Sequence, residues 1–404
     1  LYDLGRFGQV RVFPERAQGT DIVPVTITVS VAGRHELKGG GGLGYEPATY
    51  EARLRGGFTY IPQEYPLLSL NFDGRLALSV GHDFVDYEPR TRLFFNVQRL
   101  EFFRPFVIGD VGAGLEYFTL ESYTARGPIL RTGVSAPLGK RWLTGQAAWN
   151  FTYFEFFDID PLITRRDQAR FGLRDNERNG RFEQSIAADL RDKPLEPRKG
   201  AYLGLRVIEG GSFAGGAFTY LEIQPDLRGY LPIGKLSSFA FRVRGGAFLG
   251  DVPVTQRYFS GGAQNHRGFS SRVLAPVIAG TAKNEDGTDK INPMTGELVA
   301  DETPIGGEVF LETGAELRIP LGELSGLMFG TTLFLDGGDV VQQNQGLDLL
   351  NLHWAAGVGL FVKFGGFKIR IDVGRRLNRL GASELDPRNV LPNTNLFLGV
   401  GETY

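Results

Sequence analysis

Two small groups of residues have types and spacing that could support chemistry. Asp158 and Asp160 are placed like a carboxylate pair for hydrolysis, but they follow an aromatic stretch where solvated turn acids are expected. Gly39, Gly41 and Gly44 match the pattern G-x-G-x-x-G, but a dinucleotide site needs a strand before this pattern and a helix after it. No helical pattern follows these glycines. We therefore expect neither a hydrolase site nor a nucleotide site.

The composition removes further classes of chemistry. The chain of 404 residues has no cysteine, which excludes disulfides, thiolate metal ligands and cysteine nucleophiles. Its four histidines lie far apart, and no nucleophile, base and orienting residue occur at recognisable spacing. The net charge of -2 gives no basic footprint for nucleic acid. We expect a protein that is not an enzyme and that has no cofactor, no metal and no nucleic-acid partner.

The chain instead shows one strand pattern after another, with turn residues between them and almost no helical period. From Phe367 to Val373, apolar Phe, Ile and Val alternate with Lys, Arg and Asp. From Glu312 to Ile319, Glu, Gly and Arg alternate with Thr, Ala, Leu and Ile. Because neighbouring side chains of a strand point to opposite faces, each segment has one apolar and one polar face.

Strand length decides between the two architectures that use such strands. A soluble sandwich buries the apolar faces, whereas a membrane barrel turns them to lipid and encloses a polar lumen. Leu67–His82 and Leu143–Phe157 are far longer than an ordinary strand of about 5–6 residues. No apolar run of about 20 residues, which a membrane helix needs, is present. Aromatic pairs lie near the segment ends, where interfacial girdles are expected: Phe94-Phe95, Phe102-Phe103, Tyr153-Phe154 and Phe156-Phe157.

We predict an all-β transmembrane antiparallel β-barrel of about sixteen strands, an even number as bacterial barrels require. The predicted strands are residues 36–46, 50–60, 67–82, 90–102, 105–121, 128–137, 141–157, 180–190, 200–212, 216–230, 236–249, 305–319, 326–337, 350–363, 366–376 and 394–402.

Two regions do not fit the barrel pattern. Residues 1–34 include the β-branched strand Val23–Val31 and are predicted to end a small soluble domain that leads into the barrel, residues 35–404. Residues 250–304, approximately, form a polar connection of a length that is usually functional or disordered. The chain begins Leu-Tyr-Asp without a signal peptide, so we expect the targeting signal upstream.

The long connection contains the segment Arg257–Phe269, RYFSGGAQNHRGF. This segment resembles the loop signature of the outer-membrane assembly and translocation barrels, the superfamily that includes BamA, TamA, the mitochondrial sorting barrel and the two-partner secretion transporters. Ala275-Pro276 favours the TamA branch. Other features resemble the family in its own order along nearly the whole chain: the end of the last POTRA domain at residues 1–34, the glycine-rich first strand at 40–45, the turn at 192–200, the acidic strand at 334–338 and the closing strand at 398–401.

The resemblance implies that the loop motif Arg267-Gly268-Phe269 folds into the barrel, where Arg267 pairs with the lumen acids Asp336 and Glu316. The alternation, interpreted independently, also places both acids on polar faces. A guanidinium offers a planar fork of donors that suits carboxylates. One departure is His266, because most relatives have a small aliphatic residue before the arginine. The histidine argues against assuming tight apolar packing or pH-independence at this position.

The seam between the first and last strands is the one closure that no hairpin makes. Glycine in a strand weakens pairing and packing, so a seam rich in glycine could open sideways and expose strand edges to another strand. The alternative is that these glycines only allow barrel curvature. The expected seam residues are Gly39, Gly40, Gly41, Gly42, Gly44, Gly399, Val400 and Gly401.

By resemblance, we expect an assembly or insertion factor of the BamA/TamA type in a Gram-negative outer membrane, with an N-terminal periplasmic POTRA region. Its expected partners are nascent outer-membrane proteins or secreted polypeptides, the lipid bilayer, and periplasmic or lipoprotein accessory subunits. Two alternatives stay open: a polypeptide translocation pore of the two-partner secretion type, and the barrel of a fused enzyme.

Overall fold

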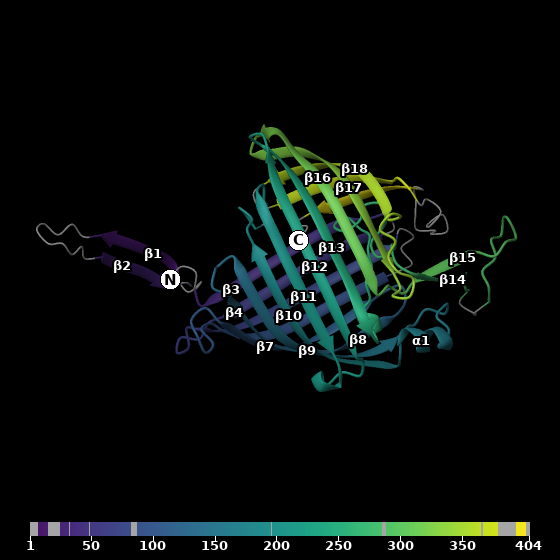
Figure 1. The fold of residues 1–404 in the computed structure, drawn as a ribbon, viewed down its shortest axis with the longest axis horizontal. Helices are drawn as coiled ribbons and strands as arrows, with labels where there is room; N and C mark the ends of the chain where they lie inside the picture. The colour runs from purple at the N-terminus through teal and green to yellow at the C-terminus, as the bar shows by residue number, and fades with distance from the viewer. Residues whose placement is uncertain are drawn as a thin grey trace, which may run out of the picture.

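Sixteen strands of the structure, a computed structural model, form one closed antiparallel barrel in which β20 pairs back onto β3 (Figure 1). This confirms the predicted fold class and strand number. The described residues are 7–14, 25–31, 33–47, 49–81, 87–194, 196–284, 288–364, 367–378 and 393–400. Among them, no helix is long and apolar enough to cross a membrane.

The strand bounds agree with the predicted ranges to within five residues where both are described. The barrel strands are β3 His35–Tyr45, β4 Thr49–Tyr60, β5 Leu68–Gly81, β6 Tyr87–Arg99, β7 Ile108–Thr119, β8 Thr124–Pro137, β9 Leu143–Phe157, β10 Asn176–Asp189, β11 Gly200–Gly210, β12 Tyr220–Ile233, β13 Ser237–Gly250, β16 Val309–Leu324, β17 Leu327–Val341, β18 His353–Phe364, β19 Phe367–Arg376 and β20 Thr394–Val400.

Alternation along each strand separates an apolar outer face from the lumen face. On β17, Leu333 and Leu335 are exposed on the outer face, whereas Thr332, Phe334 and Asp336 are buried inside. Side chains one residue apart point to opposite faces of a strand. The period predicted from the sequence therefore gives the barrel its two surfaces.

The aromatic residues predicted as girdle residues do not all face lipid: Phe94, Phe154 and Phe156 lie on the lumen face, so the prediction was wrong for these three. Phe154 and Phe156 are buried in an apolar cluster with Val254, which belongs to the connection between β13 and β16. Tyr153 and Phe157 alternate with them and point the opposite way. Adjacent residues of one strand cannot both face lipid. The lumen is therefore apolar in part, rather than polar throughout as predicted.

The two ends of the barrel differ. At the turn end, where β3 begins, short turns join the strands, as between β16 and β17. At the loop end, the connection from β9 to β10 contains α1, Arg165–Phe171. This helix was not predicted, although Thr164 and Asp167 form a capping box that the pattern T-x-x-D signals. Asp160 also departs from the expected solvated turn acid, because its Oδ2 accepts from Thr303 Oγ1 at 2.8 Å.

The connection from β13 to β16, residues 251–308, has two parts. Strands β14, Val277–Thr281, and β15, Ala300–Pro304, form a hairpin that projects beyond the loop end (Figure 1). Residues 257–271 lie against the lumen wall, and we call them the inward segment. The hairpin was not predicted, and the inward folding expected of the long loop, residues 250–304, does not extend to it. Short 3-10 turns, η2 and η3, cover Ser212–Ala214 and Val254–Gln256.

Outside the barrel, β1, Phe7–Pro14, and β2, Val25–Val31, form a two-stranded antiparallel sheet near the turn end (Figure 1). The assignment of residues 1–34 to a POTRA domain stays a prediction. Residues 1–6 and 15–24 lie outside the described residues.

Candidate functional site: the inward segment and the seam

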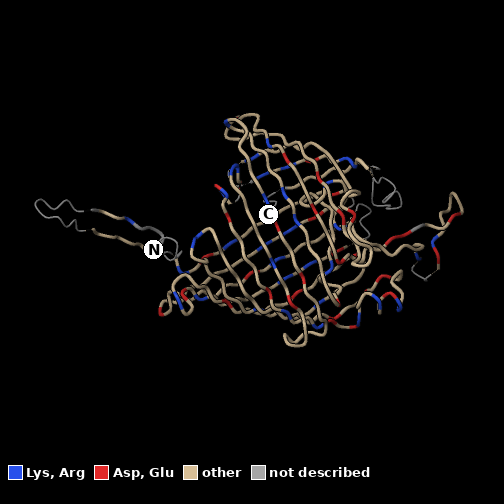
Figure 2. The backbone as a smooth tube through the Cα atoms, in the orientation of Figure 1, with Lys and Arg blue, Asp and Glu red and all other residues tan. Residues whose placement is uncertain are grey.

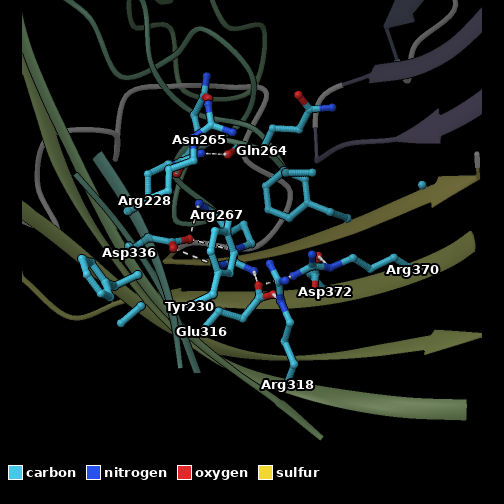
Figure 3. A pocket seen from close by; sticks show the side chains of 18 residues that line it. Arg228, Tyr230, Gln264, Asn265, Arg267, Glu316, Arg318, Asp336, Arg370 and Asp372 are labelled. Atoms are coloured by element: carbon cyan, nitrogen blue, oxygen red, sulfur yellow. Dashed lines mark hydrogen bonds and ion pairs between the residues drawn. The ribbon is translucent and has the colours of Figure 1, made fainter. Parts of the chain in front are cut away.

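The strongest polar contact of the lumen joins Arg267 of the inward segment to Asp336 of β17. Arg267 donates from Nε to Asp336 Oδ2 at 2.7 Å and from Nη2 to Oδ1 at 2.8 Å, and its backbone N–H donates to Oδ2 at 3.1 Å (Figure 3). The guanidinium carbon lies 3.4 Å from the ring centroid of Phe334. The two charged side chains are only 8% and 3% exposed. This is a desolvated bidentate ion pair, unlike the weak pairs of a protein surface.

Glu316 of β16 extends this pair into a network. Its Oε2 accepts from Arg267 Nη1 and from Arg370 Nη2, each at 2.8 Å, and its Oε1 accepts from Arg318 Nε at 2.9 Å. Arg370 also forms an ion pair with Asp372 at 2.5 Å. Burial acts to lower the pKa of Arg267, but its hydrogen bonds and charge interaction with Asp336 outweigh this and raise the pKa above the ordinary value. Arg267 is therefore charged at every physiological pH.

Backbone contacts seat the motif as closely as the ion pairs do. Gly268 O accepts from Arg376 Nε at 2.6 Å. A Cβ added at Gly374 would lie 2.2 Å from the carbonyl oxygen of Arg267. The wall of β19 therefore approaches the inward segment so closely that only glycine fits at position 374.

His266 and Phe269 are buried beside the ion pair. His266 Nε2 lies 2.9 Å from His353 O, and His266 Nδ1 accepts from Gly268 N at 3.2 Å. This pattern fits the neutral ring with its proton on Nε2. Phe269 packs edge-on against His266 and His353, with ring centroids 5.2 Å apart in each case. Despite the expectation raised by the histidine, the position is tightly packed, and burial lowers the pKa of His266.

Further contacts hold the part of the inward segment that precedes Arg267. Arg242 of β13 donates to Gln264 O at 2.8 Å and to Asn265 O at 3.0 Å. Ser260 Oγ donates to Oε1 of Glu312, which lies on the neighbouring strand β16, at 2.6 Å. A cavity of about 110 Å³ remains beneath the segment, lined by residues such as Arg228 and Phe397. The segment thus lies inside the lumen, against β13 and β16.

The seam has the shortest strand pairing of the barrel in the part of the chain that the structure describes. Among the described residues, β20 pairs with β3 only at Leu398 with Tyr45, Gly399 with Gly44, and Val400 with Leu43. By contrast, β3 pairs with β4 along its whole length, from His35 to Tyr45. Gly39 to Gly42 have no partner among the described residues of β20, and Gly401 lies outside the described residues.

The inward segment also contacts the seam strand. Ser271 N donates to Oε2 of Glu46, the residue that follows β3, at 2.8 Å. Burial raises the pKa of Glu46, and this hydrogen bond opposes the rise. The same stretch of chain that holds Arg267 against β17 therefore also contacts the end of β3.

A model of the Omp85 superfamily domain matches residues 71–388. The chain belongs to the Omp85 superfamily. Outer membrane protein assembly factor BamA of Nitratidesulfovibrio vulgaris is 28% identical over 212 residues, which cover 47% of this chain and 25% of that protein. The chain thus spans a small part of this curated relative. The Omp85 assignment makes this barrel an integral outer-membrane protein.

Solved structures agree with this Omp85 fold. BamA from Haemophilus ducreyi lacking POTRA domains 1-3 is similar with a TM-score of 0.71 at 14% identity, over 98% of this chain and 76% of that chain. CdiB from Acinetobacter baumannii is similar with a TM-score of 0.61 at 12% identity, over 98% of this chain and 66% of that chain. At these identities the likeness shows the fold.

Several residues of this Omp85 site were not predicted as site residues from the sequence, among them Phe334, Arg370, Gly374 and Arg376. The alternation of β19 already placed Arg370 and Asp372 on the lumen face. It gave no distance between strands, so the link from Arg370 to Glu316 across β17 and β18 required the closed barrel. Among the described residues, no group of three or more His, Cys, Asp or Glu side chains could hold a metal ion.

Proposed function

We propose that this barrel helps to insert and assemble other outer-membrane proteins through its seam. The pairing of β3 with β20 carries the proposal, because the first and last barrel strands make it without a hairpin between them. Parting these strands would expose two strand edges. An exposed edge is a template on which another strand can pair.

The lumen side of the seam supports the same proposal. Gly44 and Gly399 face each other, and neither has a side chain to interlock with the opposite strand. A Cβ added at Gly399 would meet no atom within 4 Å. A side chain would therefore fit at position 399, so close contacts in a curved wall are not the reason for glycine there. This observation favours an opening seam over glycines that serve curvature alone.

The inward segment has a separate part in this proposal. Arg267 joins the inward segment to β16 and β17, and Glu46 joins it to the end of β3. A desolvated ion pair is costly to break once formed, because loss of one partner leaves a buried charge. The segment would hold the wall of β16 and β17 rigid while the seam strands separate.

The finer assignments belong to the same proposal. Ala275-Pro276 favours the TamA branch, whereas the curated relative is a BamA. POTRA domains upstream of the barrel would receive nascent outer-membrane proteins in the periplasm, and accessory subunits would bind there. A full-length sequence with several POTRA domains would support this role. A hydrolase domain upstream would instead favour the fused enzyme.

A translocation pore for secreted polypeptides is the second candidate. The charged lumen face favours it, but the inward segment occupies that lumen at the level of Arg267. Conductance across a planar bilayer discriminates the translocation pore from the assembly factor. A pore must pass ions when the inward segment moves out of the lumen.

A disulfide across the seam tests the assembly role. Gly44 and Gly399 are directly opposite, and antiparallel partners lie about 4.5–5.5 Å apart between Cα atoms, which suits a disulfide. The pair Gly44→Cys and Gly399→Cys is introduced into the full-length protein in liposomes. We expect the oxidised protein to fold a client barrel about tenfold more slowly, and reductant to restore the rate.

The matched control joins Gly56 to Gly74, which are directly opposite on β4 and β5. Those strands are already connected by a turn, so Gly56→Cys with Gly74→Cys should leave the rate unchanged in both redox states. Full activity of the oxidised seam variant would refute the proposal. Because the chain has no native cysteine, no other disulfide can form within it.

A further inference from the structure

Among the arginines on the lumen face of β4, β5 and β6, three lie directly opposite one another and belong neither to the seam nor to the contacts of the inward segment. Arg55 lies directly opposite Arg75, and Arg75 lies directly opposite Arg92. Neighbouring strands are roughly 4.8 Å apart, and directly opposite residues point to the same face. The alternate positions Leu54, Leu76 and Leu93 are exposed on the outer face, so the arginines face the lumen. We call these three residues the arginine row.

The positive charge of the row is only partly compensated. The carboxylate of Asp73 accepts from Arg55 Nε at 2.8 Å and from Arg75 Nε at 2.7 Å. Glu116 of β7 lies directly opposite Arg92 and attracts it at longer range. Two carboxylates thus face three guanidinium groups, and the side chains of Arg55 and Arg75 are 62% and 54% exposed. Like charges directly opposite each other destabilise a sheet, so the row costs stability in the empty barrel.

The row lies beside the seam. Gly40 of β3 is directly opposite Arg55. The lumen-facing positions from there to the seam are Gly40, Gly42 and Gly44, with Gly399 on β20. Among the described residues of β3, no side chain therefore projects into the lumen between Gly40 and Gly44, and Figure 2 shows how Lys and Arg recur along the barrel strands.

We propose that the arginine row binds a carboxylate-rich segment of the client polypeptide beside the seam. The inference rests on the proposed assembly function and names the chemistry of the client that this wall recognises. Each guanidinium offers a fork of donors that matches a carboxylate. Side chains on one face of an extended segment are roughly 7 Å apart, within the reach of neighbouring arginines. The lumen wall there is polar, which favours a polypeptide over the acyl chains of a lipid.

The test measures peptide binding by the full-length protein in detergent. The probe is a fluorescent peptide of alternating glutamate and glycine, compared with the same peptide containing glutamine. We expect the glutamate peptide to bind more tightly, and salt to weaken its binding. The triple variant R55Q/R75Q/R92Q should bind it about tenfold more weakly. Asp73→Asn removes the competing carboxylate and should bind it more tightly than the wild type.

The control variant R99Q/R104Q/R166Q removes three exposed arginines outside the row and should bind the peptide like the wild type. Unfolding midpoints close to that of the wild type show that the variants are folded, because like charges are removed and glutamine can still donate a hydrogen bond to Asp73. Equal binding of the glutamate and glutamine peptides would overturn the proposal, as would unchanged binding by the row variant. Displacement of the peptide by short-chain phosphatidylglycerol, at concentrations below those of the peptide itself, would assign the row to lipid instead.

This test is independent of the seam disulfide. A seam variant that stays fully active when oxidised would refute the assembly role without changing peptide affinity. Conversely, loss of client folding in the oxidised seam variant, together with unchanged peptide affinity in the row variant, would retain the function and refute the row.

Discussion

Glu46 and Ser271 are 225 positions apart in the chain, and the backbone N–H of Ser271 donates to the Glu46 carboxylate at 2.8 Å. The contact joins the connection that carries Arg267 to the end of the first barrel strand. A movement of the inward segment would therefore change the support of β3 at its loop end.

Glu46→Ala should loosen the adjoining end of β3. A hydrogen bond to a charged group contributes about 1.5–3 kcal/mol, so we expect amide exchange at Gly44 and Tyr45 to accelerate about tenfold or more. Hydrogen exchange followed by mass spectrometry measures this rate. Glu36→Ala is the control, because Glu36 is an exposed residue at the opposite end of β3. Equal exchange in the wild type and Glu46→Ala would show that the contact does not support the strand.

Arg267→Ala should destabilise the barrel by about 3–5 kcal/mol, because it leaves Asp336 buried without its partner. Asp336→Ala should have a similar effect, and the double variant should cost much less than the sum. Urea unfolding in detergent micelles gives the free energies for this cycle. Arg104→Ala, at an exposed turn, is the control. Additive effects would mean that the two side chains are not energetically coupled.

Gly374→Ala should displace the inward segment without changing any charge. The added Cβ would lie 2.2 Å from the carbonyl oxygen of Arg267, so either the segment or β19 must move. We expect faster protease cleavage within residues 257–271 and a loss of stability of about 1–3 kcal/mol. Gly56→Ala is the control, since a Cβ there meets no atom within 4 Å. Wild-type protease resistance in Gly374→Ala would contradict the close packing.

Docking of the inward segment should weaken in acid through His266. In the docked segment, burial lowers the pKa of His266. The hydrogen bond to His353 O and the charges of Asp336 and Glu312 oppose this effect, whereas the charge interaction with His353 adds to it. In the undocked segment the imidazole has a pKa of about 6.5. As the pH falls, the undocked form is therefore protonated before the docked form. The contribution of His266 to docking is thus complete above a pH of about 6.5. It decreases as the pH falls from there to the lower pKa of the docked ring. Protease cleavage of the segment should rise over this range.

His266→Gln is the control for this titration, because glutamine retains a donor and an acceptor but does not ionise. Its cleavage rate should not change over the same pH range. If the wild type and His266→Gln show the same pH profile, another group is responsible.

Much of the fold was predictable because barrel strands have a strict period of two. The alternation on β16 and β17 was sufficient to place Glu316 and Asp336 in the lumen, and the loop resemblance brought Arg267 toward them. The split of Tyr153 and Phe154 between the two faces follows from the same period, but the girdle prediction relied on aromatic content without applying it. The β14–β15 hairpin was missed because its strands are five residues each and polar in part.

Other features could not be predicted from local patterns. The register of β20 on β3, which places Gly399 opposite Gly44, depends on how the sheet closes. The position of Arg370 against Glu316 depends on which lumen residues meet across strands that are not adjacent in sequence. The need for glycine at position 374 comes from a segment more than a hundred residues earlier in the chain. Such relationships arise only from the closed three-dimensional arrangement.

The bare glycine faces of Gly44 and Gly399 also bear on kinetics. On the lumen face this pair can part and meet again without a rotamer search, whereas Tyr45 and Leu398 beside it carry side chains that must repack. The lumen side of the seam would therefore not slow reclosure, and the barrel could return to its starting state after opening.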